Sequence, residues 1–323
     1  MSAVNEVVLD VDGLRVHTTD GSGLPVPIIE DVSFSLARGE VLGIVGESGS
    51  GKSMTALSVM RLIPGSLSQT GSIRLQGRDV MTLPERELQR MRGTKVSMVF
   101  QDPMTGLNPV RTVGSLLVEA LRRHRDVSRR EARKLAIEAL RAVGIPSPEL
   151  RINAYPHQLS GGLRQRVMIA MALLHDPAVI IADEPTTALD ATIQAQIIDL
   201  MRSRVTSAGL ILITHDLGVA GQICDRIIVM YAGHIVEEGT ALDLLARPRH
   251  PYTAGLLAAA PRFDRERKPL IPITGSPPTP HDRPEGCPFA PRCSRTIDPC
   301  RDQRPELVPG DLSTAACWNP LNS

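Results

Sequence analysis

The most restrictive part of this sequence is Gly46-Glu47-Ser48-Gly49-Ser50-Gly51-Lys52-Ser53. It fits the pattern GxxxxGK(S/T), in which a loop surrounds nucleotide phosphates with backbone N–H groups. A short apolar run at residues 41–45 precedes it, and helical periodicity over residues 54–62 follows it. This is the strand–loop–helix order that such a loop requires. The sequence therefore predicts a nucleotide-binding loop rather than a glycine-rich turn without a ligand.

Two side chains of this loop carry chemistry of their own. Lys52 places a positive charge between the β- and γ-phosphates of the nucleotide, and the hydroxyl of Ser53 is a ligand for Mg²⁺. The N-terminus of the following helix adds its dipole to the attraction for phosphate. The predicted nucleotide-binding set covers the loop and the start of its helix: Gly46, Ser48, Gly49, Ser50, Gly51, Lys52, Ser53 and Met54.

Polar residues also follow three other apolar runs that are typical of buried strands. Asp183 and Glu184 follow one run, and His215 follows the next. Gln101 follows a third. Because ligands bind at the carboxyl ends of parallel strands, we expect these side chains at the catalytic edge of a sheet. Asp183 and Gln101 are candidates to complete the Mg²⁺ shell with Ser53. Glu184 would orient the attacking water or accept its proton, and His215 could contact the γ-phosphate or hold Glu184 and the water in line.

A second glycine-rich stretch lies about a hundred residues after the first. It reads Leu159-Ser160-Gly161-Gly162-Leu163-Arg164-Gln165 and precedes a helical segment, 165–174. Small residues at a helix start can present backbone N–H groups and a hydroxyl to phosphate oxygens. The sequence therefore predicts a second phosphate-contacting motif.

The order of the elements indicates an α/β fold. Buried-strand runs at 41–45, 178–182 and 210–214 alternate with helical segments, which favours a doubly wound core. A β-rich region precedes the loop, with strands at 7–9 and 28–36, and a hairpin is expected at residues 227–238. The tail from residue 261 is rich in proline and arginine and has little periodicity.

Composition excludes several classes of protein. The 323 residues carry 36 Lys and Arg against 35 Asp and Glu, so a net charge of +1 does not steer the chain to nucleic acid or anionic lipid. Aromatic residues make up only 2%, which argues against base stacking on single strands. No apolar run approaches the roughly 18 residues of a membrane span, and no secretory signal is visible. A cytosolic location is the resulting expectation.

A helical segment over residues 116–144 is rich in basic residues: Arg122, Arg123, His124, Arg125, Arg129, Arg130, Arg133 and Lys134. These cations could form a patch for a membrane or a phosphate group. The alternative is a solvated helix face, which the interleaved Glu131 and other acidic residues favour.

Together these motifs resemble the ATP-binding subunit of an ABC transporter over residues 5–320. The stretch 159–165 looks like the signature motif of that superfamily, Ala188-Leu189-Asp190 like its D-loop, Gln101 like its Q-loop and His215 like its switch histidine. The resemblance implies a RecA-like P-loop core with an N-terminal antiparallel β subdomain, a helical subdomain and an irregular cysteine-rich C-terminal extension. We expect a nucleotide-binding domain at 1–250, with the helical subdomain at 102–160, and the extension at 251–323.

In such ATPases two subunits associate head to tail, with ATP between the P-loop of one and the signature of the other. The resemblance therefore implies that four signature residues complete the site of the partner: Ser160, Gly161, Gly162 and Gln165. The chain departs from the family at the adenine contact, because no aromatic residue lies near His17. Either His17 stacks on adenine or the base is held loosely.

Three segments look like the subgroup of oligopeptide and dipeptide importers, including Arg247-Pro248-Arg249-His250-Pro251-Tyr252-Thr253. The resemblance then implies an ATPase at the cytoplasmic face of the membrane that powers peptide import. It would act with a second, paralogous ATPase, two permease subunits and a substrate-binding protein, and without nucleic acid. The alternatives are an importer for nickel or another small solute, a soluble ABC ATPase, and a regulatory partner, against which Glu184 and His215 argue.

Four of the five cysteines lie near the C-terminus: Cys287, Cys293, Cys300 and Cys317. In a reducing compartment such a cluster favours metal ligation over disulfides. Zinc and an iron–sulfur cluster are both possible, although the spacing is wider than in most zinc ribbons. The resembled peptide-importer ATPases can hold a [4Fe–4S] cluster in such a tail, where it would staple a segment with little core of its own. The remaining alternative is free thiols in a loop.

Overall fold

The computed structural model describes residues 6–101, 106–186, 191–205, 207–259 and 272–321. The chain divides into two compact units, each of which is described by itself. The first consists mainly of residues 82–210, with 1–8 and 37–39. The second consists of residues 9–36, 40–81 and 211–323. The boundary expected after residue 250 stays a prediction.

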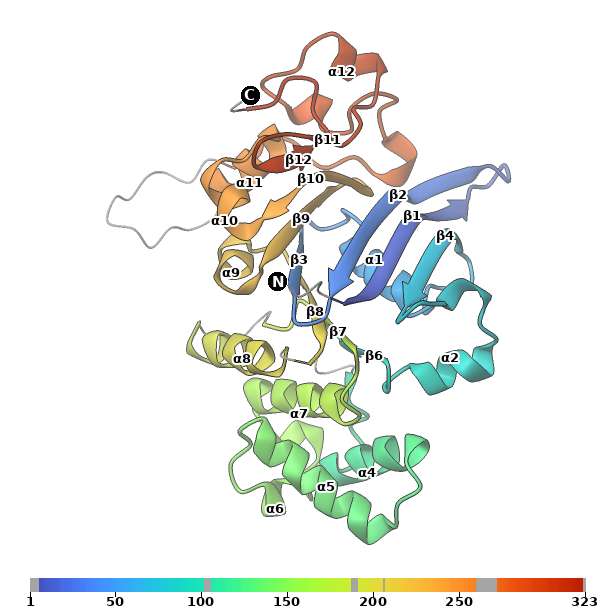
Figure 1. The fold of residues 1–323 in the computed structure, drawn as a ribbon, viewed down its shortest axis with the longest axis vertical. Coiled ribbons are helices and arrows are strands. Elements are labelled where there is room, and N and C mark those ends of the chain that lie inside the picture. Colours follow the sequence, from blue (N-terminus) through green and yellow to red (C-terminus); the bar gives the residue numbers. More distant parts are fainter. Residues whose placement is uncertain (1–5, 102–105, 187–190, 206, 260–271, 322–323) are drawn as a thin grey trace. The chain divides into compact units, whose positions relative to one another are not determined.

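The second unit contains a four-stranded sheet of order β2-β1-β4-β5, of which Figure 1 labels β2, β1 and β4. Its strands are β1 (Val7–Thr19), β2 (Pro25–Ala37), β4 (Ser68–Leu75) and β5 (Arg78–Asp79). β4 pairs antiparallel with both β1 and β5. The predicted antiparallel β subdomain is confirmed. β1 and β2 are longer than the apolar runs indicate, and β1 stays paired with β4 as far as His17.

A second sheet of this unit carries the phosphate-binding loop. Neighbouring strands follow the order β11-β12-β10-β9-β3-β8. Their bounds are β3 (Val41–Val45), β8 (Gly209–Thr214), β9 (Arg226–Tyr231), β10 (His234–Thr240), β11 (Val308–Pro309) and β12 (Ser313–Ala315). β3 runs parallel to β9, whereas β9, β10, β12 and β11 are successively antiparallel. The sheet is therefore mixed, and the C-terminal tail adds two strands to it.

The predicted hairpin joins β9 to β10 through Ala232 and Gly233. Both residues have positive φ, +46° and +82°. Two consecutive left-handed residues are the requirement of the two-residue turn that matches the twist of a hairpin. A Cβ at Gly233 would also clash with the carbonyl oxygen of Ile28, so only glycine fits there.

Short helices complete the second unit. They are α1 (Lys52–Val59), η1 (Val80–Thr82), α9 (Leu217–Ile223), α10 (Ala241–Ala246), α11 (Pro251–Ala259), η3 (Pro280–Asp282), η4 (Ala290–Arg292) and α12 (Pro299–Asp302). Cys224 ends α9 and is 8% exposed, so it belongs to the core of this unit.

The first unit combines two parallel strands with helices. The strands β6 (Val96–Val99) and β7 (Val179–Asp183) pair in parallel. The helices are α2 (Glu85–Met91), α4 (Val113–His124), α5 (Arg129–Ala142), α6 (Pro148–Arg151), η2 (Pro156–Gln158), α7 (Gly161–Leu173) and α8 (Ala191–Arg204). Every residue of β7 is buried, as its continuous apolar run predicts.

The helical segment predicted at 116–144 is two helices. α4 ends at His124, and α5 starts after Ser128, whose side chain accepts a hydrogen bond from the N–H of Glu131 at 3.1 Å. A serine cap of this kind defines a new helix start. The two helices pack on each other through apolar residues at helical spacing: Leu117 and Leu121 of α4 and Ala132, Ala136 and Leu140 of α5.

Candidate functional site

The predicted phosphate-binding loop joins β3 to α1. Its last glycine, Gly51, is the N-cap of α1 and has φ +104°, a conformation that other residues rarely adopt. Gly46 opens the loop, and a Cβ there would clash with the backbone carbonyl of Met230. Glycine is therefore needed at one end for backbone conformation and at the other for close approach.

Lys52 is 6% exposed and its ammonium lies inside the loop. Its Nζ donates hydrogen bonds to the carbonyl oxygens of Gly46 at 2.7 Å and Glu47 at 2.9 Å. Ser53, the next residue, is exposed, so its hydroxyl is available for a cation. The loop thus holds the charge that is needed for phosphate, next to an accessible hydroxyl.

His215 lies between a buried strand and a capped helix. It follows β8, and Asp216 caps α9 by accepting hydrogen bonds from the N–H groups of Gly218 at 2.7 Å and Val219 at 3.2 Å. The N–H of Asp216 donates to Thr214 Oγ1 at 3.0 Å. This bonding fixes the backbone on both sides of His215, which is exposed.

The first unit brings Gln101 and Glu184 together. Gln101 Nε2 donates a hydrogen bond to Glu184 Oε2 at 3.1 Å. Glu184 has φ +44°, an uncommon conformation for a non-glycine residue and one that gathers at functional sites. Asp183, at the end of β7, is 5% exposed. The structure therefore places three predicted site residues at the ends of β6 and β7.

The second glycine-rich motif starts α7. Ser160 is its N-cap, with Oγ accepting from the N–H of Leu163 at 3.4 Å, and both Ser160 and Gly161 are exposed. Gly162 lies against α8, where a Cβ would approach Ile193 Cγ2 to 2.9 Å. Gln165 differs from these residues, since its side chain is 1% exposed and has no hydrogen-bond partner among the described residues. Its amide is therefore not presented at the surface as the Ser160 and Gly161 positions are.

Comparison with known proteins identifies the family. The ABC transporter family profile matches residues 29–187, and the profile of the oligopeptide/dipeptide transporter C-terminal region matches residues 236–300. The dipeptide transport ATP-binding protein DppD of Bacillus subtilis is 48% identical over 97% of this chain and 95% of its own length. This chain belongs to the ABC transporter ATP-binding proteins.

A second relative and a solved structure are also similar to this chain. The oligopeptide transport ATP-binding protein OppD of Escherichia coli is 48% identical over 98% of this chain and 94% of its own. Among solved structures, the ATP-binding cassette MJ0796 in a dimeric, post-hydrolysis state with ADP and Pi has a TM-score of 0.64 and 29% identity. The match covers 72% of this chain and 98% of the MJ0796 chain. The cassette fold predicted from the sequence is thereby confirmed.

Two further expectations concern the D-loop and membrane-spanning helices. The predicted D-loop, 188–190, lies outside the described residues. Among the helices that the structure describes, none has the length and apolar character of a membrane span.

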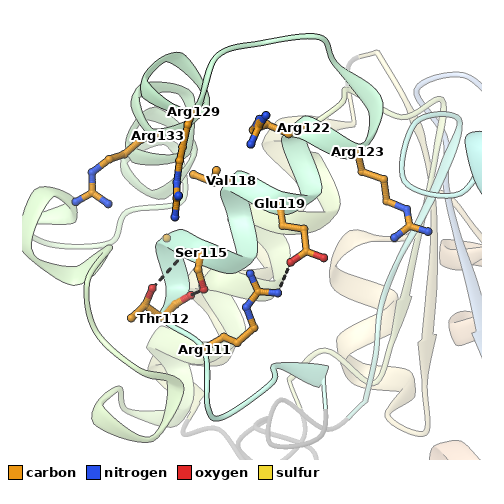
Figure 2. A pocket seen from close by; sticks show the side chains of 10 residues that line it. Arg111, Thr112, Ser115, Val118, Glu119, Arg122, Arg123, Arg129 and Arg133 are labelled. Carbon is orange, nitrogen blue, oxygen red and sulfur yellow. Dashed lines mark hydrogen bonds and ion pairs between the residues drawn. The ribbon is translucent and has the colours of Figure 1, made fainter.

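The arginine-rich segment of this ABC protein borders a cavity of about 600 Å³ beside α4 and α5 (Figure 2). Arg111 forms an ion pair with Glu119 across its rim. The cavity is lined by Arg111, Thr112, Gly114, Ser115, Val118, Glu119, Arg122, Arg123, Arg129 and Arg133. The cations thus face a recess and not only solvent, so neither sequence interpretation describes them fully.

The four C-terminal cysteines lie close enough to influence one another. Burial, together with the neighbouring Cys300, Cys317 and Cys293 thiolates, raises the pKa of Cys287 to about 11. Burial also raises the pKa of Cys317. In the described part of the chain, however, no three or more Cys, His, Asp or Glu side chains form a group that could hold a metal ion. The donor set suits a metal centre, but its arrangement is not that of an ion site.

Sequence patterns did not predict two residues that contact the phosphate-binding loop. Tyr252 and Arg292 both contact Glu47 of the loop, from 205 and 245 residues away. Tyr252 lies in segment 247–253, which resembles the peptide-importer subgroup. That resemblance is the one feature of the sequence that points to a role for Tyr252. No such feature points to Arg292, since arginines are frequent throughout the tail.

Proposed function

We propose that this chain is the ATP-hydrolysing subunit of an ABC importer for dipeptides or oligopeptides. The supporting observation is similarity at 48% identity that continues through the C-terminal tail to transport ATP-binding proteins for peptides. A fold shared with ABC ATPases in general would not include that tail, since the solved cassette covers only 72% of the chain.

In the proposed reaction the P-loop binds ATP as its Mg²⁺ complex. Lys52 neutralises charge on the β- and γ-phosphates, and Ser53, Gln101 and Asp183 hold Mg²⁺. Glu184 orients the attacking water and accepts its proton. The hydrogen bond from Gln101 to Glu184 supports this role, because it fixes the direction of a carboxylate that would otherwise rotate.

His215 is the second catalytic residue of the proposal. Its side chain would contact the γ-phosphate or hold the water in line with Glu184. The capped helix that follows it supports a fixed position. Around the loop, the remaining phosphate contacts come from backbone N–H groups through Met54.

The signature motif would act on the nucleotide of a second ATPase subunit. The exposed Ser160 and Gly161 support this role, since both can approach phosphate oxygens from outside the chain. Gln165 would have to leave its buried position to do the same. We further propose that the second ATPase is a paralogue, so that the pair is a heterodimer.

The remaining partners follow from an importer. Two permease subunits would cross the membrane, and an extracytoplasmic binding protein would deliver the peptide. This chain would lie at the cytoplasmic face, with helical segment 102–160 against the permeases. The arginine-lined cavity beside α4 and α5 supports a contact with acidic groups there.

For the tail we propose a [4Fe–4S] cluster on Cys287, Cys293, Cys300 and Cys317. Zinc would hold its sulfurs about 2.3 Å from one ion, which would bring them close together. A four-iron cluster separates its ligands further. The cysteines lie near enough for the thiolates of Cys300, Cys317 and Cys293 to raise the pKa of Cys287, which supports a group shared by all four. Its role would be structural, as a staple for a tail of short elements.

Purification from membranes tests the function. The chain, tagged and solubilised in detergent, should co-purify with two membrane proteins and a second ATPase, and the complex should hydrolyse ATP faster when peptide and binding protein are added. Stimulation of ATP hydrolysis by nickel instead of peptide would show that the transported solute is nickel and not a peptide. Recovery with ribosomes, or with no membrane protein, would contradict an importer.

A further inference from the structure

Glu47, the second residue of the phosphate-binding loop, is held at three points. Its backbone N–H donates to Tyr252 Oη at 2.8 Å. Its carboxylate accepts two hydrogen bonds from Arg292, Nη1 to Oε2 at 2.6 Å and Nη2 to Oε1 at 3.0 Å. Its carbonyl oxygen accepts from Lys52 Nζ at 2.9 Å. Two of the three partners therefore belong to the C-terminal part of the chain.

The side chain of Arg292 is buried. It is 5% exposed, against 25% for Glu47. Its Nε donates to the carbonyl of Thr274 at 2.9 Å, and Nη1 also contacts Tyr231 Oη at 3.2 Å. A guanidinium bonded on all sides has one orientation, and its paired N–H groups fix the plane of the carboxylate that they contact.

An aromatic cluster sets the position of both C-terminal partners. Tyr252 is fully buried, and its ring lies 4.6 Å from that of Tyr231 and 5.3 Å from that of Phe289. Phe289 stands three residues before Arg292. Packing of these rings therefore places the Tyr252 hydroxyl and the Arg292 guanidinium together.

The position of Glu47 matters because its carbonyl holds Lys52. The ammonium is retained by the carbonyls of Gly46 and Glu47, both at the start of the loop. A shift of residue 47 would move an acceptor of this ammonium and the backbone N–H groups next to it. Loops that bind phosphate through backbone groups depend on such geometry.

We propose that Arg292, with Tyr252, is a positioning residue for the phosphate-binding loop: the C-terminal segment fixes Glu47 and thereby the loop that receives ATP. The inference rests on the proposed function, since it presumes that this loop binds ATP. Arg292 directly precedes Cys293, so the segment that carries two of the four cysteines also carries this contact. The tail thus contributes to the nucleotide site of its own chain.

Titration calorimetry of the full-length chain with ATP and Mg²⁺ tests this. Arg292→Ala should raise the Kd for ATP at least about tenfold, because a charged, bidentate contact is lost. Arg292→Lys keeps the charge but cannot donate two parallel hydrogen bonds to the carboxylate, so its Kd for ATP should lie between those of the wild type and Arg292→Ala. Arg295→Ala is the matched control, since Arg295 of the same segment bonds to Asn319 and should leave the Kd unchanged.

A double-mutant cycle separates this contact from general damage. Glu47→Gln combined with Arg292→Ala should bind ATP no more weakly than the poorer single variant, because both remove one interaction. A folded Arg292→Ala with the wild-type Kd, or fully additive losses, would overturn the inference. If Arg292→Ala does not fold, Tyr252→Phe and Arg292→Lys decide in its place: wild-type Kd values in both would overturn the inference.

Lys52→Ala distinguishes the two proposals. If the wild-type chain binds ATP and Lys52→Ala does not, the proposed function stands and the Arg292 variants judge the positioning role. If the wild-type chain and Lys52→Ala bind equally or not at all, the proposed function fails.

Discussion

Gln101 and Glu184 are joined by a hydrogen bond of 3.1 Å between the amide nitrogen and the carboxylate. The residues follow β6 and β7, which pair in parallel, so the bond links the ends of adjacent strands. It also holds a carboxylate whose backbone is in a left-handed conformation. The candidate base of the reaction is thus oriented before any ligand arrives.

Replacing Gln101 by Ala should therefore slow ATP turnover more than it weakens ATP binding. We expect a fall in kcat of about tenfold, the size of one hydrogen bond to a charged group. Steady-state kinetics of the assembled transporter would measure this. Gln101→Glu should be worse than Gln101→Ala, since a second carboxylate beside Glu184 raises the pKa of the pair. Equal kcat for both variants and the wild type would contradict an orienting role.

Gly46 and Gly49 provide a steric comparison within one loop. Gly46→Ala should lower the free energy of unfolding by about 3 kcal/mol, because the added methyl group meets the Met230 carbonyl. Gly49→Ala meets no neighbouring atom and should lose only about 1 kcal/mol through its positive φ. Urea unfolding without nucleotide measures both. A Gly46→Ala variant as stable as Gly49→Ala would show that the loop is placed differently.

Acid should destabilise the chain through His250. Burial lowers the pKa of this histidine from 6.5 to about 3. Between these values the unfolded chain binds a proton that the folded chain does not, so the free energy of unfolding falls as pH falls from 6.5 toward 3. Urea midpoints at pH 7 and 5 measure the loss.

The variant for this test is His250→Gln. A glutamine can still accept the N–H of Tyr252, as Nδ1 of His250 does at 3.1 Å, but it does not titrate. It should lose less stability than the wild type over the same pH interval. An identical loss would place the acid sensitivity elsewhere.

The cysteine proposal predicts a metal content. Anaerobically purified protein should contain about four irons and four sulfides per chain and a visible absorption band that oxygen bleaches. Cys293→Ser should lower the iron content, whereas Cys224→Ser, in the core beside Gly43, should not. Zinc, or no metal, would refute the cluster.

Local patterns were sufficient for much of this protein. The loop, the strand ends at Asp183 and His215, and the β9–β10 hairpin each depend on a few consecutive residues with defined turn or burial requirements. Both residues of the Gln101–Glu184 pair could be predicted, because each follows a buried run. Their hydrogen bond could be anticipated only through strand pairing.

Contacts between distant segments could not be predicted in this way. Arg292 lies 245 residues from Glu47, and neither residue type marks the pairing. Gln165 is the last residue of the signature stretch and lies in α7, where packing and not the motif decides which side chains are buried. The break between α4 and α5 was missed because arginine and alanine favour helix on both sides of the Ser128 cap.

Glu184→Gln in the assembled transporter is the most direct test of the proposed function. The substitution keeps shape and removes the proton acceptor, so ATP hydrolysis should fall at least about a hundredfold while ATP remains bound. ATP-driven uptake of a labelled dipeptide into vesicles should be lost with it. Glu138→Gln, an exposed position on α5, should change neither rate. Hydrolysis and dipeptide uptake near wild-type rates in Glu184→Gln would contradict the assignment of this chain as the ATPase that powers import.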